Sequence, residues 1–314
     1  MRVVFIGTGE IGVPTLEALQ QSEHELAGIV TQPDKPSGRN QEMTASPVKK
    51  ALAKNKMLPI LQPKRIKDRQ AIEEIRALKP EVMVVMAYGQ ILSRDLLEIP
   101  PIACLNLHAS LLPRWRGAAP IQAAIAAGDR ETGITVIYMD EGLDTGDILL
   151  QREIGILPGE TGGSLHDRLA QIAPEVLLES LHLLANKNAP RTPQNSAVAT
   201  YAPKLKREAG RIDWSEPAEV IERKIRAYNP WPGGSTQLAG GNLKIFSTSI
   251  VDLNGKPGEI LGRDRELIIA AGHRALSLGE LQLEGKRRMS AAEFLRGHAS
   301  LLERGMLISG STGC

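Results

Sequence analysis

Residues 3–12 read Val-Val-Phe-Ile-Gly-Thr-Gly-Glu-Ile-Gly, an apolar run followed at once by closely spaced glycines. A short apolar run that ends in glycine is typical of a buried strand turning into a helix. The same alternation continues along the first half of the chain. We expect strands at residues 26–31, 82–87, 103–107 and 134–139, and helices at residues 14–21, 47–54, 68–78, 119–127 and 165–184. Apolar strands separated by helices predict an α/β fold with a doubly wound, mostly parallel sheet.

The length of 314 residues predicts two domains. We expect a larger α/β domain at residues 1–189, a polar, proline-dotted linker at residues 190–206 and a smaller domain at residues 207–314. The third segment holds one amphipathic stretch and several short strand-like runs punctuated by glycine, which is the pattern of a small β-barrel.

The composition narrows the class of protein. Hydrophobic residues at 42% and charged residues at 24% exclude a disordered or fibrous chain. Cys104 and Cys314 offer neither a disulfide framework nor metal-ligand spacing. The N-terminal run is too short for a signal peptide, and no segment reaches the roughly 18 apolar residues of a membrane span. We therefore expect a cytoplasmic protein that contacts no membrane.

The glycines of the opening stretch raise the alternative of a nicotinamide enzyme. Gly7, Gly9 and Gly12 match the dinucleotide-binding spacing at the expected place between strand and helix. That fingerprint also requires an acidic residue at the end of the second strand, where this chain has Thr31 and Gln32. The glycines are equally explained by a tight turn, and an NAD-dependent oxidoreductase stays a less favoured alternative.

The strongest chemical pattern lies in the strand at residues 103–107 and directly after it. Residues two apart in a strand share a face, so Asn106 and His108 project together at the carboxyl end of an apolar strand. Open α/β sheets place their ligand crevice at that end. A glycine-rich acidic loop at residues 140–147 can return the carboxylate of Asp144 to the same crevice, and its spacing lacks the ligand ladder of a calcium loop. The alternative is a hydrogen-bonded core pair without chemistry.

These residues resemble the folate-dependent formyltransferases. Asn106, His108 and Asp144 are similar to that family's Asn, His and Asp triad, and Ser110-Leu111-Leu112-Pro113 is similar to a folate-binding segment. The stretch at residues 114–122, Arg-Trp-Arg-Gly-Ala-Ala-Pro-Ile-Gln, resembles the branches that act on tRNA or on sugar nucleotides. The segments at residues 212–215 and 226–232 resemble the opening of the C-terminal domain of the branch that acts on methionyl-tRNA, whose barrel is similar to an oligonucleotide-binding fold.

The resemblance implies a reaction and a set of contacts. The donor would be 10-formyltetrahydrofolate and the acceptor the amino group of methionine on initiator tRNA. No metal, nicotinamide or obligate protein partner is implied. Asn106 would donate to the oxyanion, His108 would assist and carry a proton, and Asp144 would orient His108. The implied folate contacts are Ser110, Leu111, Leu112, Pro113, Tyr88, Gly89, Ile91, Leu92 and Asp140, and the implied tRNA contacts are Arg39, Lys35, Arg114, Arg116, Lys204, Lys206 and Arg207.

One stretch departs from the family pattern. Residues 40–44 read Asn-Gln-Glu-Met-Thr where the family commonly has lysines, and an acidic side chain near phosphates is unfavourable. Arg39 is then the main candidate for a contact with the acceptor arm. The remaining alternatives are another folate-dependent formyltransferase, with a sugar-nucleotide or glycinamide ribonucleotide acceptor, and a non-catalytic tRNA-binding protein. The latter would leave Asn106, His108 and Asp144 without a purpose.

Overall fold

The computed structural model describes residues 1–38, 41–52, 58–303 and 305–308. The chain forms two compact units. The N-terminal unit comprises Met1–Pro120, Glu131–Gly155 and His166–Ala202, and the C-terminal unit comprises Ile121–Arg130, Ile156–Leu165 and Pro203–Cys314. The boundaries expected at residues 189 and 207 stay a prediction, which limited proteolysis would test.

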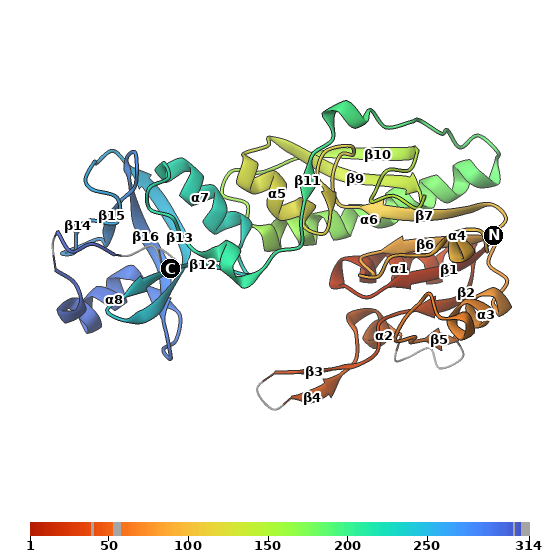
Figure 1. Cartoon of the computed structure of the whole chain (residues 1–314), viewed down its shortest axis with the longest axis horizontal. Helices are drawn as coiled ribbons and strands as arrows, with labels where there is room; N and C mark the ends of the chain where they lie inside the picture. The colour runs from red at the N-terminus through yellow and green to blue at the C-terminus, as the bar shows by residue number, and fades with distance from the viewer. Residues whose placement is uncertain (39–40, 53–57, 304, 309–314) are drawn as a thin grey trace. The chain divides into compact units, whose positions relative to one another are not determined.

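A seven-stranded sheet organises the N-terminal unit (Figure 1). Its strands in chain order are β1 (Arg2–Gly7), β2 (Glu25–Val30), β5 (Ile60–Leu61), β6 (Val82–Met86), β7 (Ala103–His108), β9 (Glu131–Tyr138) and β10 (Ile148–Gly155). Hydrogen bonding orders them β10-β9-β7-β6-β1-β2-β5. Five of these strands, β7, β6, β1, β2 and β5, run parallel to one another, whereas β9 and β10 add antiparallel strands at one edge. The predicted mostly parallel sheet is confirmed.

Helices and short ribbons connect these strands. The helices are α1 (Val13–Gln21), α2 (Pro47–Ala51), α3 (Arg69–Ala77), α4 (Arg94–Leu97), α5 (Pro120–Ala127) and α6 (Gly162–Ala185), with a 3-10 turn at Glu10–Gly12. Two small ribbons pair β3 (Lys35–Ser37) with β4 (Glu42–Thr44) and β8 (Arg116–Gly117) with β11 (Tyr201–Ala202). The β3–β4 ribbon extends away from the seven-stranded sheet in Figure 1.

The sheet changes direction of winding between β1 and β6. From β1 the chain proceeds outward through β2 and β5, then returns to the other side of β1 at β6. Open α/β sheets bind ligands at such a switch point, outside the carboxyl ends of the two strands, which here are Gly7 and Met86. A Cβ at Gly7 would lie 2.6 Å from the Phe5 ring and 2.9 Å from the Met86 carbonyl oxygen. Close packing therefore explains this glycine without a bound dinucleotide.

The C-terminal unit has its own antiparallel sheet, as the sequence predicts. Its strands are β12 (Gly234–Leu238), β13 (Gly241–Val251), β14 (Ile260–Gly262), β15 (Ile268–Ala270), β16 (Ala275–Leu283) and β17 (Met289–Ser290), with helices α7 (Ala218–Ala227) and α8 (Ala291–His298). The order is β12-β13-β16-β15-β14, and β17 pairs with β16. Trp214 and Phe294 are buried in its apolar core with residues of these strands and both helices.

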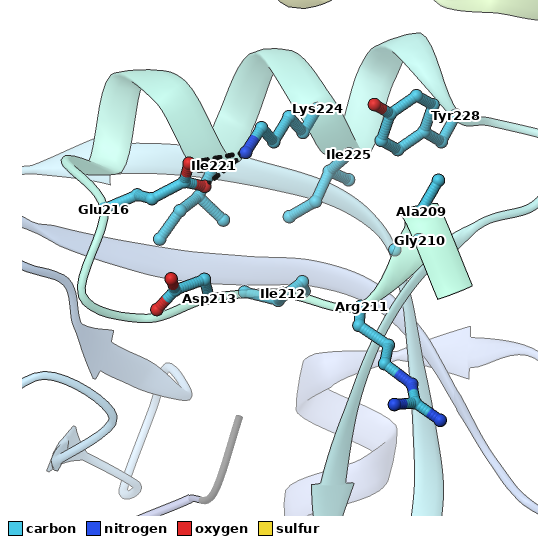
Figure 2. A pocket seen from close by; sticks show the side chains of 11 residues that line it. Ala209, Gly210, Arg211, Ile212, Asp213, Glu216, Ile221, Lys224, Ile225 and Tyr228 are labelled. Carbon is cyan, nitrogen blue, oxygen red and sulfur yellow. Dashed lines mark hydrogen bonds and ion pairs between the residues drawn. The ribbon is translucent and has the colours of Figure 1, made fainter. Parts of the chain in front are cut away.

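A cavity of about 10 Å³ lies beside α7 in this unit. Figure 2 shows Ile221 and Ile225 of α7 on one side of it and Ile212 on the other, while the Lys224 ammonium pairs with the Glu216 carboxylate. A volume of that size holds about one water molecule. The cavity is therefore a packing feature of the α7 contact rather than a substrate site.

The Cys104 thiol on β7 gives a first test of the N-terminal core. Burial raises the pKa of this thiol to about 12. At pH 8 this thiol is then almost entirely protonated, whereas the thiolate is the reactive form. In a Cys314→Ser variant we expect Cys104 to resist a chromogenic thiol reagent in the native state and to react fully in denaturant. Native labelling at the rate of a free thiol would contradict this packing.

Candidate active site

Asn106 and His108 lie on one face of β7, which is flanked on both sides by other strands. The His108 imidazole is buried, with 7% of its side chain exposed, whereas Asn106 is partly accessible. The alternation of β7 places Leu105 and Leu107 on the opposite face, where both are buried. The strand thus presents two polar side chains at its carboxyl end because the intervening leucines belong to the core.

The loop after β9 brings Asp144 to the same place. Asn106 Nδ2 donates to Asp144 Oδ1 at 3.2 Å, and His108 Nδ1 lies 3.7 Å from Asp144 Oδ2. Only 15% of the Asp144 side chain is exposed. The structure therefore brings the three predicted residues together in one cluster, which we call the Asn-His-Asp cluster.

Two backbone features force the loop into this position. Asp144 has φ of +53°, a left-handed conformation that Asp tolerates better than most residues. A Cβ at Gly146 would lie 1.7 Å from the Tyr138 carbonyl oxygen, so only glycine fits where the loop packs on the end of β9. The glycine-rich sequence of the loop is therefore required for the carboxylate to return to β7.

The carboxylate also accepts a hydrogen bond from backbone. Gly117 N donates to Asp144 Oδ2 at 2.8 Å. Gly117 has φ of +115°, and a Cβ there would lie 2.6 Å from the Ala202 carbonyl oxygen. Each oxygen of Asp144 thus receives one N–H donor, which fixes the orientation of the carboxylate.

His108 is oriented by a residue that the sequence did not indicate. Its Nε2 lies 2.8 Å from the Trp115 carbonyl oxygen, which can only accept, so Nε2 carries a proton and donates. The tautomer follows from that contact. Nδ1 faces Asp144 at a distance longer than a hydrogen bond. The Trp115 carbonyl rather than Asp144 is therefore the group that holds the ring.

The cluster combines complementary chemical groups. An amide NH2 has two hydrogens, so Asn106 can donate to Asp144 and to a second acceptor together. The imidazole can exchange a proton through Nδ1, and the carboxylate can accept one. Among the residues that the structure describes, no group of three or more His, Cys, Asp or Glu side chains could hold a metal ion. The arrangement suits stabilisation of an oxyanion together with proton transfer.

The predicted folate residues divide into buried and accessible ones. Ser110 Oγ donates to the Arg114 carbonyl oxygen at 2.6 Å, and Leu112 is buried, so these two shape the segment after β7. Tyr88 and Leu92 are buried, and burial raises the pKa of the Tyr88 phenol to about 12. The remaining predicted folate contacts have partly or fully exposed side chains or backbone: Gly89, Ile91, Leu111, Pro113 and Asp140.

The predicted tRNA contacts divide in the same way. Five have exposed side chains: Lys35, Arg114, Lys204, Lys206 and Arg207. Arg39 lies outside the described residues. Arg116 is 2% exposed, and its guanidinium donates to Gln194. A side chain buried in this way cannot reach RNA phosphates, so Arg116 is not proposed as a tRNA contact.

A larger cavity, about 430 Å³, lies in the C-terminal unit. Arg207, Arg211 and Lys244 contribute cations to its lining, and Glu208 and Glu284 contribute carboxylates. Its volume is in the range of ligand sites. Of the predicted RNA contacts that the structure describes, Arg207 alone lines this cavity.

No described helix has both the length and the apolar character needed to cross a membrane.

Comparison with known proteins agrees with this geometry. Residues 1–181 match the Formyl transferase family and residues 204–299 match the family described as Formyl transferase, C-terminal domain. A methionyl-tRNA formyltransferase from Akkermansia muciniphila is 46% identical over 309 residues, which cover 96% of this chain and 98% of the relative. A solved methionyl-tRNA formyltransferase from Clostridium thermocellum shares the fold, with a TM-score of 0.57 at 20% identity over 80% of this chain and 94% of that one.

HypX from Aquifex aeolicus, solved in complex with tetrahydrofolic acid, also shares the fold, with a TM-score of 0.64 at 20% identity. The match covers 94% of this chain but only 47% of HypX, so the chain spans about half of that longer protein. The two family matches together cover most of the sequence, and one relative is 46% identical along nearly its whole length. These findings assign the family. The chain belongs to the formyl transferase family.

Proposed function

We propose that this enzyme transfers a formyl group from 10-formyltetrahydrofolate to the amino group of methionine esterified to initiator tRNA. The observation that carries the proposal is the convergence of Asn106, His108 and Asp144 at the carboxyl end of β7. The near-full-length relatives named methionyl-tRNA formyltransferase support the choice of acceptor. Because this acceptor is used in translation, the proposal includes a cytoplasmic location.

The acceptor amine must be neutral to attack the formyl carbon. An α-amino group titrates near about 7.7–8.0, and the neighbouring ester lowers that value, so much of it is unprotonated near neutral pH. A new C–N bond forms, the carbonyl oxygen becomes an oxyanion, and the bond from the formyl carbon to the folate nitrogen then breaks. The amine loses one proton and the folate nitrogen gains one.

Asn106 is positioned to stabilise the oxyanion. One hydrogen of its amide is held by Asp144, which aims the second hydrogen in a fixed direction. A donor placed in advance costs no reorganisation when charge develops. His108 can support it only when Nδ1 is protonated, because Nε2 already donates to the Trp115 carbonyl oxygen.

Proton movement falls to His108 and Asp144. The Trp115 carbonyl fixes the proton on Nε2, so Nδ1 is the nitrogen that exchanges protons. The carboxylate 3.7 Å away stabilises the ring when Nδ1 is protonated. A water between the amine and Asp144 would complete the path from the acceptor to the leaving nitrogen.

The donor carries the activated formyl group. Residues that directly follow two neighbouring strands would bind this donor. The stretch after β6, with Gly89 and Ile91, follows the switch point of the sheet, and the segment at residues 110–113 follows β7. The Ile91 side chain is 84% exposed, an unusual environment for an isoleucine that a flat pterin-like ring would cover. The solved complex of HypX with tetrahydrofolic acid supports a folate donor.

Contacts with tRNA phosphates give a prediction for the exposed cations at residues 204, 206 and 207. In a Lys204→Ala/Lys206→Ala/Arg207→Ala variant we expect a higher KM for tRNA and an unchanged kcat. The slope of log KM against log salt should fall by roughly 2 to 3, because each lost phosphate contact removes about 0.7–0.9. Steady-state formylation at several salt concentrations measures both.

The matched control removes the same charge from exposed side chains elsewhere, as Lys67→Ala/Lys256→Ala/Arg265→Ala. An equal change in both triple variants would show that only net charge matters, and the proposed contacts would be wrong.

The acceptor assignment is tested by offering the purified protein several amines with 10-formyltetrahydrofolate. We expect rapid formylation of initiator Met-tRNA, much slower reaction with elongator Met-tRNA, and none with an amino-sugar nucleotide or glycinamide ribonucleotide. Formylation of the sugar nucleotide with tRNA inert would replace this proposal by the sugar-nucleotide alternative.

A further inference from the structure

Gln194 lies in the segment expected to be a linker, yet its side chain contacts the loop that carries Asp144. Its Nε2 donates to the Asp144 carbonyl oxygen at 2.9 Å and to the Gly146 carbonyl oxygen at 2.8 Å. Carbonyl oxygens only accept, so the amide nitrogen must face them. One side chain therefore bridges two carbonyls of the loop.

The other end of the Gln194 amide is held by Arg116. Gln194 Oε1 accepts from Arg116 Nη2 at 2.7 Å and from Arg116 Nε at 3.1 Å. Arg116 is the largest fully buried side chain among the described residues. A guanidinium in the interior is costly unless its donors are used, so this bidentate contact fixes Arg116 and Gln194 together.

The same segment also contacts Trp115, whose carbonyl oxygen orients His108. The Thr192 and Ile148 backbones exchange hydrogen bonds of 2.8 and 3.0 Å just after the Asp144 loop. Thr200 Oγ1 accepts from Trp115 N at 2.9 Å, and Arg116 N donates to the Thr200 carbonyl oxygen at 2.9 Å. Residues 192–202 therefore form a strap, which we call the 192–202 strap, across both loops of the Asn-His-Asp cluster.

We propose that Gln194 is a positioning residue for formyl transfer, locked by Arg116 and acting through Asp144. The inference rests on the proposed function, because it assigns Gln194 a part in that reaction. The Asp144 backbone is left-handed, a conformation that persists where surrounding contacts determine it. The two hydrogen bonds from Gln194 supply such contacts on either side of Thr145.

A shift of the Asp144 loop would disturb the Asn-His-Asp cluster. The carboxylate is aimed at Asn106 and at Gly117, so a shift of the loop misaligns both hydrogen bonds. A displacement of about 1 Å in a reacting arrangement can cost about 100-fold in rate. Substrate affinity should change little, because Gln194 faces the protein and not the proposed substrate segments.

The test uses the isosteric variant Gln194→Glu. Glutamate keeps an oxygen for Arg116 but presents a second oxygen to the Asp144 and Gly146 carbonyls, where no donor is left. We expect kcat to fall by about 10- to 100-fold with KM for both substrates within about threefold. Gln194→Ala removes the contacts with the loop carbonyls and with Arg116 together, and should also lower kcat. Asn188→Ala, an exposed amide in the chain before the strap, serves as the control.

Hydrogen exchange provides a readout that does not depend on activity. In Gln194→Glu we expect faster exchange at the amides of residues 142–147, with β6 and β7 unchanged. Unchanged exchange in that loop would overturn the positioning role, and so would faster exchange spread over the whole sheet. A wild-type protein inactive with Met-tRNA would refute the proposed function alone, since the exchange result stands separately. Normal kcat in Gln194→Glu beside an active wild type would refute only the role of Gln194.

Discussion

Replacing Asp144 with asparagine is expected to reduce kcat for formylation by about 10²–10⁴-fold, the range typical of a lost acid or base. Asp144 accepts from Asn106 on one oxygen and from Gly117 on the other. An asparagine at this position would turn its NH2 group toward either the Asn106 amide or the Gly117 N–H. One of the two hydrogen bonds is therefore lost. Asparagine tolerates the left-handed conformation at φ +53°, which separates loss of the carboxylate from backbone strain.

The measurement is steady-state formylation of initiator Met-tRNA, with thermal unfolding followed in parallel. Glu141→Ala is the matched control, because it removes an exposed carboxylate from the same loop. We expect this control to keep kcat within about threefold, since a surface change away from a special contact usually has a small effect. Near-normal turnover by Asp144→Asn would show that the carboxylate plays no part in the reaction.

Asn106→Ala is expected to lower kcat by about 10²–10³-fold, or about 2.7–4 kcal/mol, the usual cost of one oxyanion donor. The effect should fall on kcat and not on KM, because the oxyanion exists only in the transition state. Asn106 is partly accessible, so its truncation leaves no large cavity in the core, and the melting temperature should change little.

A comparison of variants at the same position sharpens this test. Asn106→Asp keeps the shape but places a second carboxylate beside Asp144 and removes the donor. It should therefore be no more active than Asn106→Ala. A raised KM with normal kcat in either variant would assign Asn106 to substrate binding rather than to oxyanion stabilisation.

The strand that carries the cluster was predictable because its chemistry is local. Period-two alternation places Asn106 and His108 on one face from sequence alone, and the structure agrees. Strand β10 was not predicted. It lies at the sheet edge with alternating burial, and Arg152 and Glu153 interrupt its apolar pattern. Edge strands exposed on one side lack the continuous apolar run that marked the central strands.

The sequence does not predict groups that act through the backbone. It also does not predict contacts between residues far apart in sequence. The Trp115 carbonyl and the Gly117 amide belong to the main chain, and any residue type would carry them. Gln194 is 50 residues away from Asp144 in sequence and lies in a proline-dotted stretch that resembles a linker. Such contacts depend on how the loops fold together.

Arg116 shows the limit of inferring an interface from charge. The sequence places this arginine between Trp115 and a glycine, next to an exposed Arg114, and a tRNA contact was a natural prediction. The structure buries it because Gln194 supplies an acceptor for its guanidinium. A buried cation with a partner is indistinguishable in sequence from a solvated one, since the partner arrives from a remote segment.

Single-turnover transfer from radiolabelled 10-formyltetrahydrofolate to initiator Met-tRNA is the most direct measurement. With enzyme in excess over Met-tRNA, one labelled formyl group should appear on the methionine nitrogen for each tetrahydrofolate released. Release of tetrahydrofolate with the label in free formate, or no release at all, would show that the cluster of Asn106, His108 and Asp144 does not pass a formyl group to methionyl-tRNA.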